Sequence, residues 1–153
     1  ALAGDRPADA LRLLEQAQAD AGAANDRALA GSISADRARA LVAMGQDLAG
    51  AQALAQAREL ATQDPAVWLL SATLARRMED LASARGWIAI AAALDPANPA
   101  VGLEAGVIAV LGGSDEAARQ SWQSVIDLAP QSPQADTART YLAQLSQPVE
   151  PGQ

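Results

Sequence analysis

The chain has 153 residues and a formal net charge of −7, and half of its residues are apolar, most of them alanine. Cysteine, histidine and lysine are absent, which excludes disulfides, thiolate nucleophiles, zinc sites with Cys or His ligands, Ser-His-Asp triads and lysine Schiff bases. The acidic balance argues against a nucleic-acid partner, and no apolar run approaches the ~20 residues of a membrane span.

Helices are the only elements that the apolar pattern predicts, because apolar residues recur at the spacing of one helix face along most of the chain. The polar, proline-containing residues 146–153 are expected to form a disordered tail. In chain order, the expected helices cover about 7–19, 26–44, 47–62, 65–78, 80–94, 99–111, 115–129 and 133–145.

Three prolines, Pro65, Pro99 and Pro133, follow one another at one constant interval. Each comes directly after a residue that caps helices well, namely an aspartate, an asparagine and a serine. Such a pair marks a helix start, because the cap side chain accepts a free N–H and proline has none to lose. The stretch 65–97 therefore aligns with 99–131 without a gap, and each unit reads as two helices.

A break separates the two helices of the second unit. Gly112 and Gly113 are expected to end the first helix, because glycine tolerates the left-handed conformation of a helix C-cap. Ser114 is expected to cap the next helix, with Asp115 and Glu116 at the positive end of its dipole. The carboxylate pairs at helix starts, Glu79-Asp80 included, are interpreted as caps rather than as a catalytic dyad.

The chain upstream of Pro65 repeats more loosely. Its segment 47–51 resembles 80–84, a displacement one position shorter than the interval between the prolines, so the register of this unit stays open. The first helix reads as the second half of a unit, and we expect either further repeats before Ala1 or a partner that covers it. The resulting single domain, 1–145, comprises a half-repeat 4–22, a degenerate repeat 26–64, repeats 65–98 and 99–132, and a capping helix 133–145.

A helix–turn–helix unit of about 34 residues resembles the tetratricopeptide repeat. Departures from the family pattern are Gly102 at a position that is usually large, and Ala75 and Ala109 where an aromatic residue is usual. The resemblance implies an all-α, right-handed α-solenoid, in which small residues let paired helices approach closely. The family's positions 4, 8, 20, 24, 27 and 32 hold Trp68, Ala72, Ala84, Ile88, Ala91 and Pro96 in one unit, and Gly102, Gly106, Ala118, Trp122, Val125 and Pro130 in the next.

Repeats of this family bind extended peptides on a concave surface, and the resemblance assigns the contact positions. Some relatives grip a C-terminal carboxylate with lysine, asparagine and arginine at such positions. Here positions 5 and 9 hold Leu69, Thr73, Leu103 and Val107, so this clamp is absent, which disfavours recognition of chaperone tails. The stretch from Val107 to Leu111 is equally compatible with being covered by the capping helix. The expected peptide-binding groove consists of Leu69, Thr73, Arg76, Arg77, Leu103 and Val107.

The three tryptophans are expected to lie in different surroundings. Trp68 and Trp122 occupy core positions of the repeat. Trp87 lies beside the core stripe, so packing against the neighbouring unit is favoured, and a surface contact or dimer site is the alternative.

We therefore expect a non-catalytic scaffold or adaptor that binds a protein or peptide segment, without cofactor, metal, nucleic acid or small-molecule substrate. One alternative is a periplasmic chaperone module of the cytochrome c maturation type, which the spacing of Trp122, Ile126 and Pro130 before a short helix resembles. Another is an assembly or targeting module of a larger chain. The arginine- and alanine-rich usage suggests a bacterial source, and the periplasm or cell envelope is slightly favoured over the cytoplasm. The oligomeric state stays open.

Overall fold

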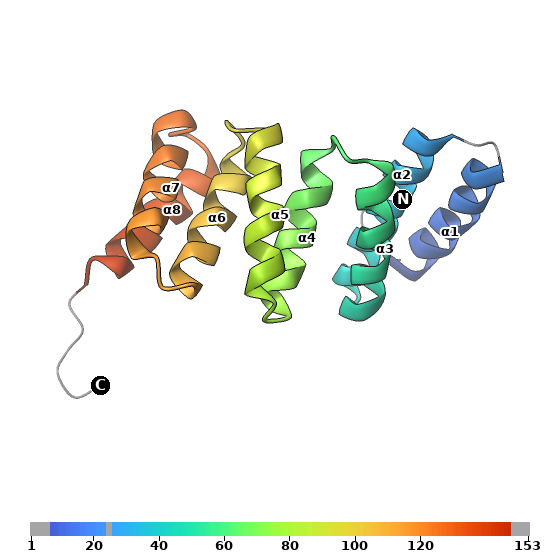
Figure 1. The fold of residues 1–153 in the computed structure, drawn as a ribbon, viewed down its shortest axis with the longest axis horizontal. Helices are drawn as coiled ribbons and strands as arrows, with labels where there is room; N and C mark the ends of the chain where they lie inside the picture. The colour runs from blue at the N-terminus through green and yellow to red at the C-terminus, as the bar shows by residue number, and fades with distance from the viewer. Residues whose placement is uncertain (1–6, 24–25, 148–153) are drawn as a thin grey trace.

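The computed structural model describes residues 7–23 and 26–147, and every regular element in these ranges is an α-helix (Figure 1). The expected all-α repeat architecture is confirmed. The helices are α1 Pro7–Ala23, α2 Arg27–Ala43, α3 Asp47–Leu60, α4 Pro65–Arg77, α5 Leu81–Leu94, α6 Pro99–Leu111, α7 Asp115–Leu128 and α8 Pro133–Leu145. Most of the expected tail, 148–153, lies outside the described residues, as do the first residues of the expected half-repeat.

Helices α4, α6 and α8 begin as the proline pattern predicts. Their first residue is proline, and the preceding side chain accepts a backbone N–H of the first turn. Ser114 is the N-cap residue of α7, as expected, but its side chain makes no capping hydrogen bond there. Asp80 does cap α5, and hydrogen bonds from the Ser83 side chain and backbone lower the pKa of its carboxyl.

The turn inside each unit fixes the register that the sequence left open. Gly45, Glu79 and Gly113 all have positive φ, at 73°, 63° and 80°. The same backbone hydrogen bond closes each turn, from Gln46 to Leu41 at 2.9 Å and between the equivalent residues of both later units at 2.8 Å. The α2–α3 unit therefore keeps the same repeat interval as the later units, and Gln46 rather than Asp47 is the equivalent of Asp80.

The helices form two layers along the long axis of the molecule. Helices α2, α4, α6 and α8 each contact the next member of this set, whereas α3, α5 and α7 make no contact with one another within the described ranges. We call the first set the inner layer and the second the outer layer, since the closer-packed layer is the inside of the curve. In Figure 1, α3 lies in front of α2 and α5 in front of α4.

Small residues at two repeat positions lie where the helices of a unit meet. Ala38 and Ala72 of the inner layer are fully buried, as are Ala84 and Ala118 of the outer layer. Larger side chains fill the remaining space one turn further along the outer-layer helices: Leu54, Ile88 and Trp122 are 1%, 7% and 4% exposed. Helix α1 packs on α2 through Leu11, Leu14 and Ala17.

Trp122 and Gly106 form the tightest of these contacts. An ideal Cβ on Gly106 would lie 2.1 Å from Nε1 of Trp122, so only glycine admits the indole here. The indole N–H donates to the carbonyl of Leu103 at 3.1 Å, which satisfies the buried polar atom. The expected core role of Trp122 is confirmed, whereas Trp68 is only half-buried at the edge of its cluster.

The Trp122–Gly106 contact predicts coupled effects on stability. Trp122→Ala should lower the free energy of unfolding by about 3–5 kcal/mol, because it leaves a large cavity. Gly106→Ala should destabilise by about 1–3 kcal/mol through overpacking. The double variant should lose less than the sum of the two, since removing the indole makes room for the new methyl group. Urea denaturation of the four proteins measures this; strictly additive losses would contradict the assigned contact.

The positive φ of Glu79 predicts that a glycine at this position stabilises the protein. A non-glycine residue with positive φ costs about 1–2 kcal/mol, part of which glycine regains at some cost in unfolded-state entropy. Glu79→Gly should therefore raise the free energy of unfolding by about 0.5–1 kcal/mol, seen as a higher urea midpoint at unchanged slope. Gly45→Ala and Gly113→Ala are the matched controls and should lower the midpoint; a lower midpoint for Glu79→Gly would refute the prediction.

Candidate functional site

An apolar hollow lies between the inner-layer helices α6 and α8. Its volume is about 180 Å³, and no charged side chain lines it. Leu111, at the end of α6, is 54% exposed beside it, although leucine is usually buried. Because its lining is apolar and open on one side, this hollow can accept an apolar side chain from another molecule. It is lined by Val107, Val110 and Leu111 of α6, Trp122 of α7 and Tyr141 of α8.

Packing between two rings holds this hollow in shape. Trp122 and Tyr141 meet at a centroid distance of 5.2 Å with ring planes inclined at 51°. Trp122 itself is fixed by Gly106 and by its hydrogen bond to Leu103, so the aromatic wall belongs to the rigid core. Tilted ring pairs of this kind add to the stability of a packed cluster.

The leucines and valine of the predicted groove occupy different surroundings. Leu69 is half-buried and packs against the α4–α6 core, and Leu103 is half-buried and packs against the cluster around Trp122. Val107 lines the hollow, although it also contacts the Trp122 cluster. Thr73 is half-buried on α4. The structure thus places one of these four residues in the hollow and leaves Leu69 and Leu103 serving the core as well.

Both arginines of the predicted groove are engaged in ion pairs. Arg76 pairs with Glu104 on the next inner-layer helix, with side chains only 25% and 12% exposed. Arg77 pairs with Asp47 of α3 at 3.4 Å. An acidic ligand would therefore compete with carboxylates that already bind these arginines. The spacing of residues in the sequence gave no signal for these pairs, because the partners lie 28 and 30 residues away.

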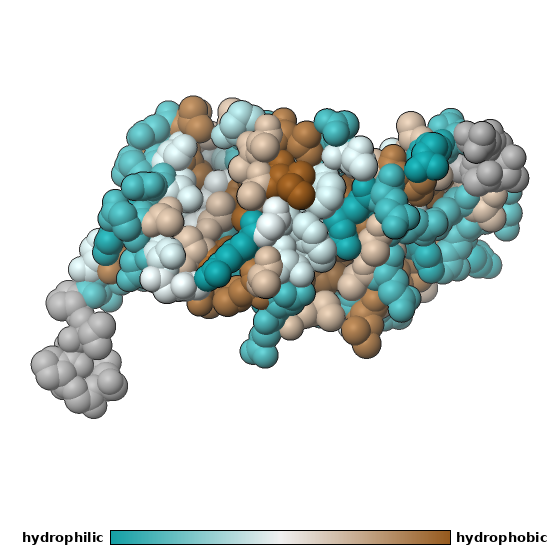
Figure 2. Space-filling view, in the orientation of Figure 1, coloured by the Kyte–Doolittle hydropathy of each residue, from teal (hydrophilic) through white to brown (hydrophobic). Residues whose placement is uncertain are grey.

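Trp87 lies at the junction between two units. The guanidinium of Arg58 on α3 stacks over its ring at 3.9 Å, and Arg58 also donates to the hydroxyl of Ser71 at 2.8 Å. Burial lowers the pKa of Arg58, against the opposing effect of Glu59. Trp87 is half-buried in this arrangement, between the core cluster of α4 to α6 and Arg58 of the preceding unit. Figure 2 shows hydrophilic side chains over α1 to α3 and hydrophobic ones gathered in the middle of the array around α5.

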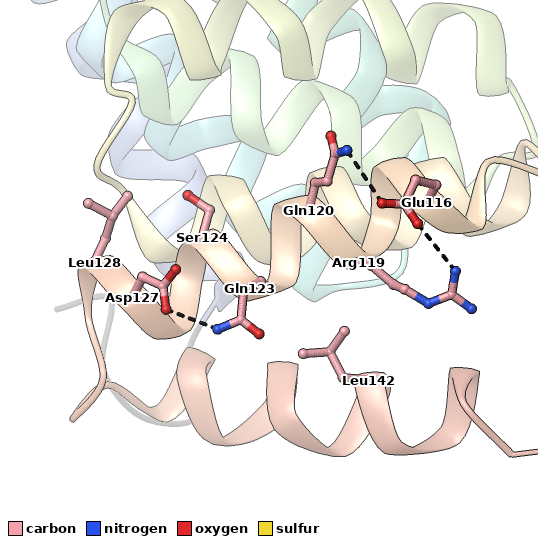
Figure 3. Close-up of a pocket in the computed structure, with 8 residues that line it drawn as sticks. All are labelled: Glu116, Arg119, Gln120, Gln123, Ser124, Asp127, Leu128 and Leu142. Carbon is pink, nitrogen blue, oxygen red and sulfur yellow. Dashed lines mark hydrogen bonds and ion pairs between the residues drawn. The ribbon is translucent and has the colours of Figure 1, made fainter.

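A wider hollow of about 710 Å³ lies along α7, facing α8 (Figure 3). Its polar side chains pair within their own helix: Gln123 donates to Asp127, and Gln120 and Arg119 both reach Glu116. Such pairs are typical of a solvated helix face. Apart from Ser124, the polar side chains that line this hollow are therefore already paired with one another. Its lining consists of Glu116, Arg119, Gln120, Gln123, Ser124, Asp127 and Leu128 of α7 and Leu142 of α8.

Neither a metal site nor a membrane span is found in the part of the chain that the structure describes. No cluster of three or more acidic side chains there could hold a metal ion. Within the same ranges, no helix combines the length and the apolar character needed to cross a bilayer.

Comparison with known proteins rests on structure alone, since no sequence-family description and no curated protein matches the chain. The tetratricopeptide-repeat (TPR) domain of Arabidopsis OM64 matches with a TM-score of 0.71 at 16% identity, over 77% of this chain and 98% of that one. The first TPR of Spaghetti (RPAP3), bound to the HSP90 peptide SRMEEVD, matches at 0.68 and 15%, over 76% and 94%. YrrB, a TPR protein with an unusual peptide-binding site, matches at 0.66 and 22%, over 72% and 57%. The chain therefore has the tetratricopeptide-repeat fold that its repeat positions indicate.

Proposed function

We propose that this chain is a non-catalytic interaction module that binds a peptide or protein segment along its inner layer. One apolar side chain of the partner enters the hollow between α6 and α8 and packs against Leu111, Val107 and Tyr141. The observation that carries the proposal is this apolar, partly open hollow on the layer that would face a bound segment.

Burial of apolar surface would supply the affinity. Each Å² of apolar surface removed from water contributes about 25 cal/mol, and the half-exposed Leu111 has surface left to bury. Ordering an extended segment offsets part of this gain, so a single anchor gives weak to moderate binding. Val107, Leu69 and Leu103 shape the surface, with Thr73 as its polar neighbour.

An acidic C-terminal tail is not the expected partner. The RPAP3 domain is bound to a peptide ending in Glu-Glu-Val-Asp, whereas this chain has no lysine and its Arg76 and Arg77 already pair with carboxylates. Breaking the half-buried Arg76–Glu104 pair would leave Glu104 without its partner, which costs free energy. Binding should therefore depend little on salt.

The narrower roles rest on the sequence alone. A cytochrome c maturation-type chaperone and a targeting module of a larger chain would both use the same apolar hollow. They differ in the partner, so the sequence of the peptides that bind would distinguish them.

Selection from a displayed library of random peptides tests the proposal. Enriched peptides should share one large apolar residue, and Leu111→Glu should weaken their binding at least about tenfold, because it places a charge at the mouth of the apolar hollow. Fluorescence anisotropy of labelled peptides measures the dissociation constant. Leu111 is the suitable position because, unlike Leu69 and Leu103, it is exposed enough to change without disturbing the core.

Leu48→Glu provides the matched control. Leu48 is 74% exposed on the outer-layer helix α3, so the same change in charge there should leave peptide affinity unaltered. Circular dichroism should show the same helix content in both variants. Equal affinity of wild type and Leu111→Glu for the selected peptides would place recognition elsewhere and overturn the proposal.

A further inference from the structure

Two junctions between consecutive units are equivalent in the repeat but are filled differently. The first lies where α3, α4 and α5 meet, and the second lies one repeat onward, where α5, α6 and α7 meet. In the first junction the space is occupied by Trp68 and by the stack of Arg58 on Trp87. A hollow of about 100 Å³ remains beside this stack.

Specific contacts hold the indole of Trp68 at the first junction. Its N–H donates to the carbonyl of Thr62 at 2.9 Å, while its ring packs against the core cluster that also contacts Trp87. Arg58 is fixed over Trp87 and by Ser71. This junction therefore shows what kind of group the repeat accommodates there: an aromatic ring with one N–H donor directed to a loop carbonyl.

The second junction lacks every one of these large groups. At the equivalent repeat positions, Ala92 replaces Arg58, Gly102 replaces Trp68, Ala105 replaces Ser71 and Ser121 replaces Trp87. A hollow of about 290 Å³ lies at this second junction. Its lining is Ala92, Pro96, Val101, Gly102, Ala105, Gln120, Ser121 and Ser124.

The lining of the second junction is suited to a ring with a polar edge. Val101 is buried, and with Ala92 and Ala105 it provides an apolar wall. Ser121, Ser124 and Gln120 provide polar groups on the α7 side. Pro96 stands at the place of Thr62, so its carbonyl is the equivalent acceptor.

We infer that the hollow at the α5–α6–α7 junction is a binding site for one indole-type ring, whose N–H donates to the carbonyl of Pro96. The site belongs to the junction between units and is separate from the hollow between α6 and α8. This inference can therefore be tested separately from the peptide-binding proposal.

Titration of the isotope-labelled protein with indole tests the inference by two-dimensional nuclear magnetic resonance. We expect saturable shifts of the amide signals of Gly102, Ser121 and Ser124, with weak, roughly millimolar affinity for so small a ligand. 1-Methylindole, which lacks the N–H donor, should bind several-fold more weakly. Absence of saturable shifts, or shifts confined to Val110, Leu111 and Tyr141, would overturn the inference.

A transplant of the first junction should close the site. The double variant Gly102→Trp/Val125→Ala places an indole and an alanine where the first junction has Trp68 and Ala91. The alanine is needed because an ideal Cβ on Gly102 lies 2.6 Å from Cγ2 of Val125. This variant should abolish the indole shifts at Ser121 and Ser124. Undiminished indole binding by the folded variant would contradict the assignment.

The converse variant keeps the test decisive if the transplant fails to fold. Trp68→Ala empties the first junction, so indole should shift the signals of Val67 and Ser71 in addition to those of the second junction, and should raise the melting temperature of this variant more than that of wild type. No new shifts at Val67 and Ser71 would show that the junction does not accept a free ring, against the inference.

Parallel titration with N-acetyltryptophanamide distinguishes the source of the ring. Binding of both probes at Gly102 and Ser121 indicates that a tryptophan side chain of a partner can enter. Binding of indole alone indicates a free small molecule, because the backbone groups on the amide probe would then clash with the mouth of the hollow.

Discussion

Close approach of the two helices within each unit is the constraint on which the rest of the structure depends. Buried alanine or glycine at the meeting points removes side-chain volume, so the backbones come together and one larger residue fills the space that remains. Gly106 shows how little room there is, since a single methyl group would overlap the Trp122 indole. Stacking of neighbouring units then buries the faces that a lone unit would leave in water.

This constraint decides where the surface can be hollow. The alanines and glycines where the paired helices meet cannot become much larger, whereas residues at the edges and junctions can vary in size. Tryptophan therefore occurs in three different settings: Trp122 is buried, Trp68 is at the edge of its cluster, and Trp87 lies under a guanidinium. The hollows between α6 and α8 and at the α5–α6–α7 junction occur where an edge or junction position holds a smaller or more exposed residue than its counterpart.

The repeat period and most helix starts could be predicted from the sequence because they rest on local signals. Pro65, Pro99 and Pro133 act through their own backbone and the residue before them, and the structure reproduces all three starts. The register of the α2–α3 unit could not be predicted, because the equivalent turns share a positive φ rather than a residue type. Gly45 is a residue that indicates a positive φ, whereas Glu79 at the equivalent position is not. The ion-pair partners of Arg76 and Arg77 could not be predicted either, because an ion pair between helices depends on the direction of the side chains, which sequence spacing does not give.

Charge also limits which partners the proposed interaction surface could bind. The chain is strongly acidic as a whole, yet no charged residue lines the hollow between α6 and α8. Next to it, the half-buried pair of Arg76 and Glu104 presents opposite charges that largely cancel at a distance. A long-range field that draws an oppositely charged segment to this surface is therefore weak, and the overall negative charge slows the approach of acidic ones. Under the proposed function, selectivity would therefore come from shape at contact distance, that is, from whether a side chain fills the space beside Trp122 and Tyr141.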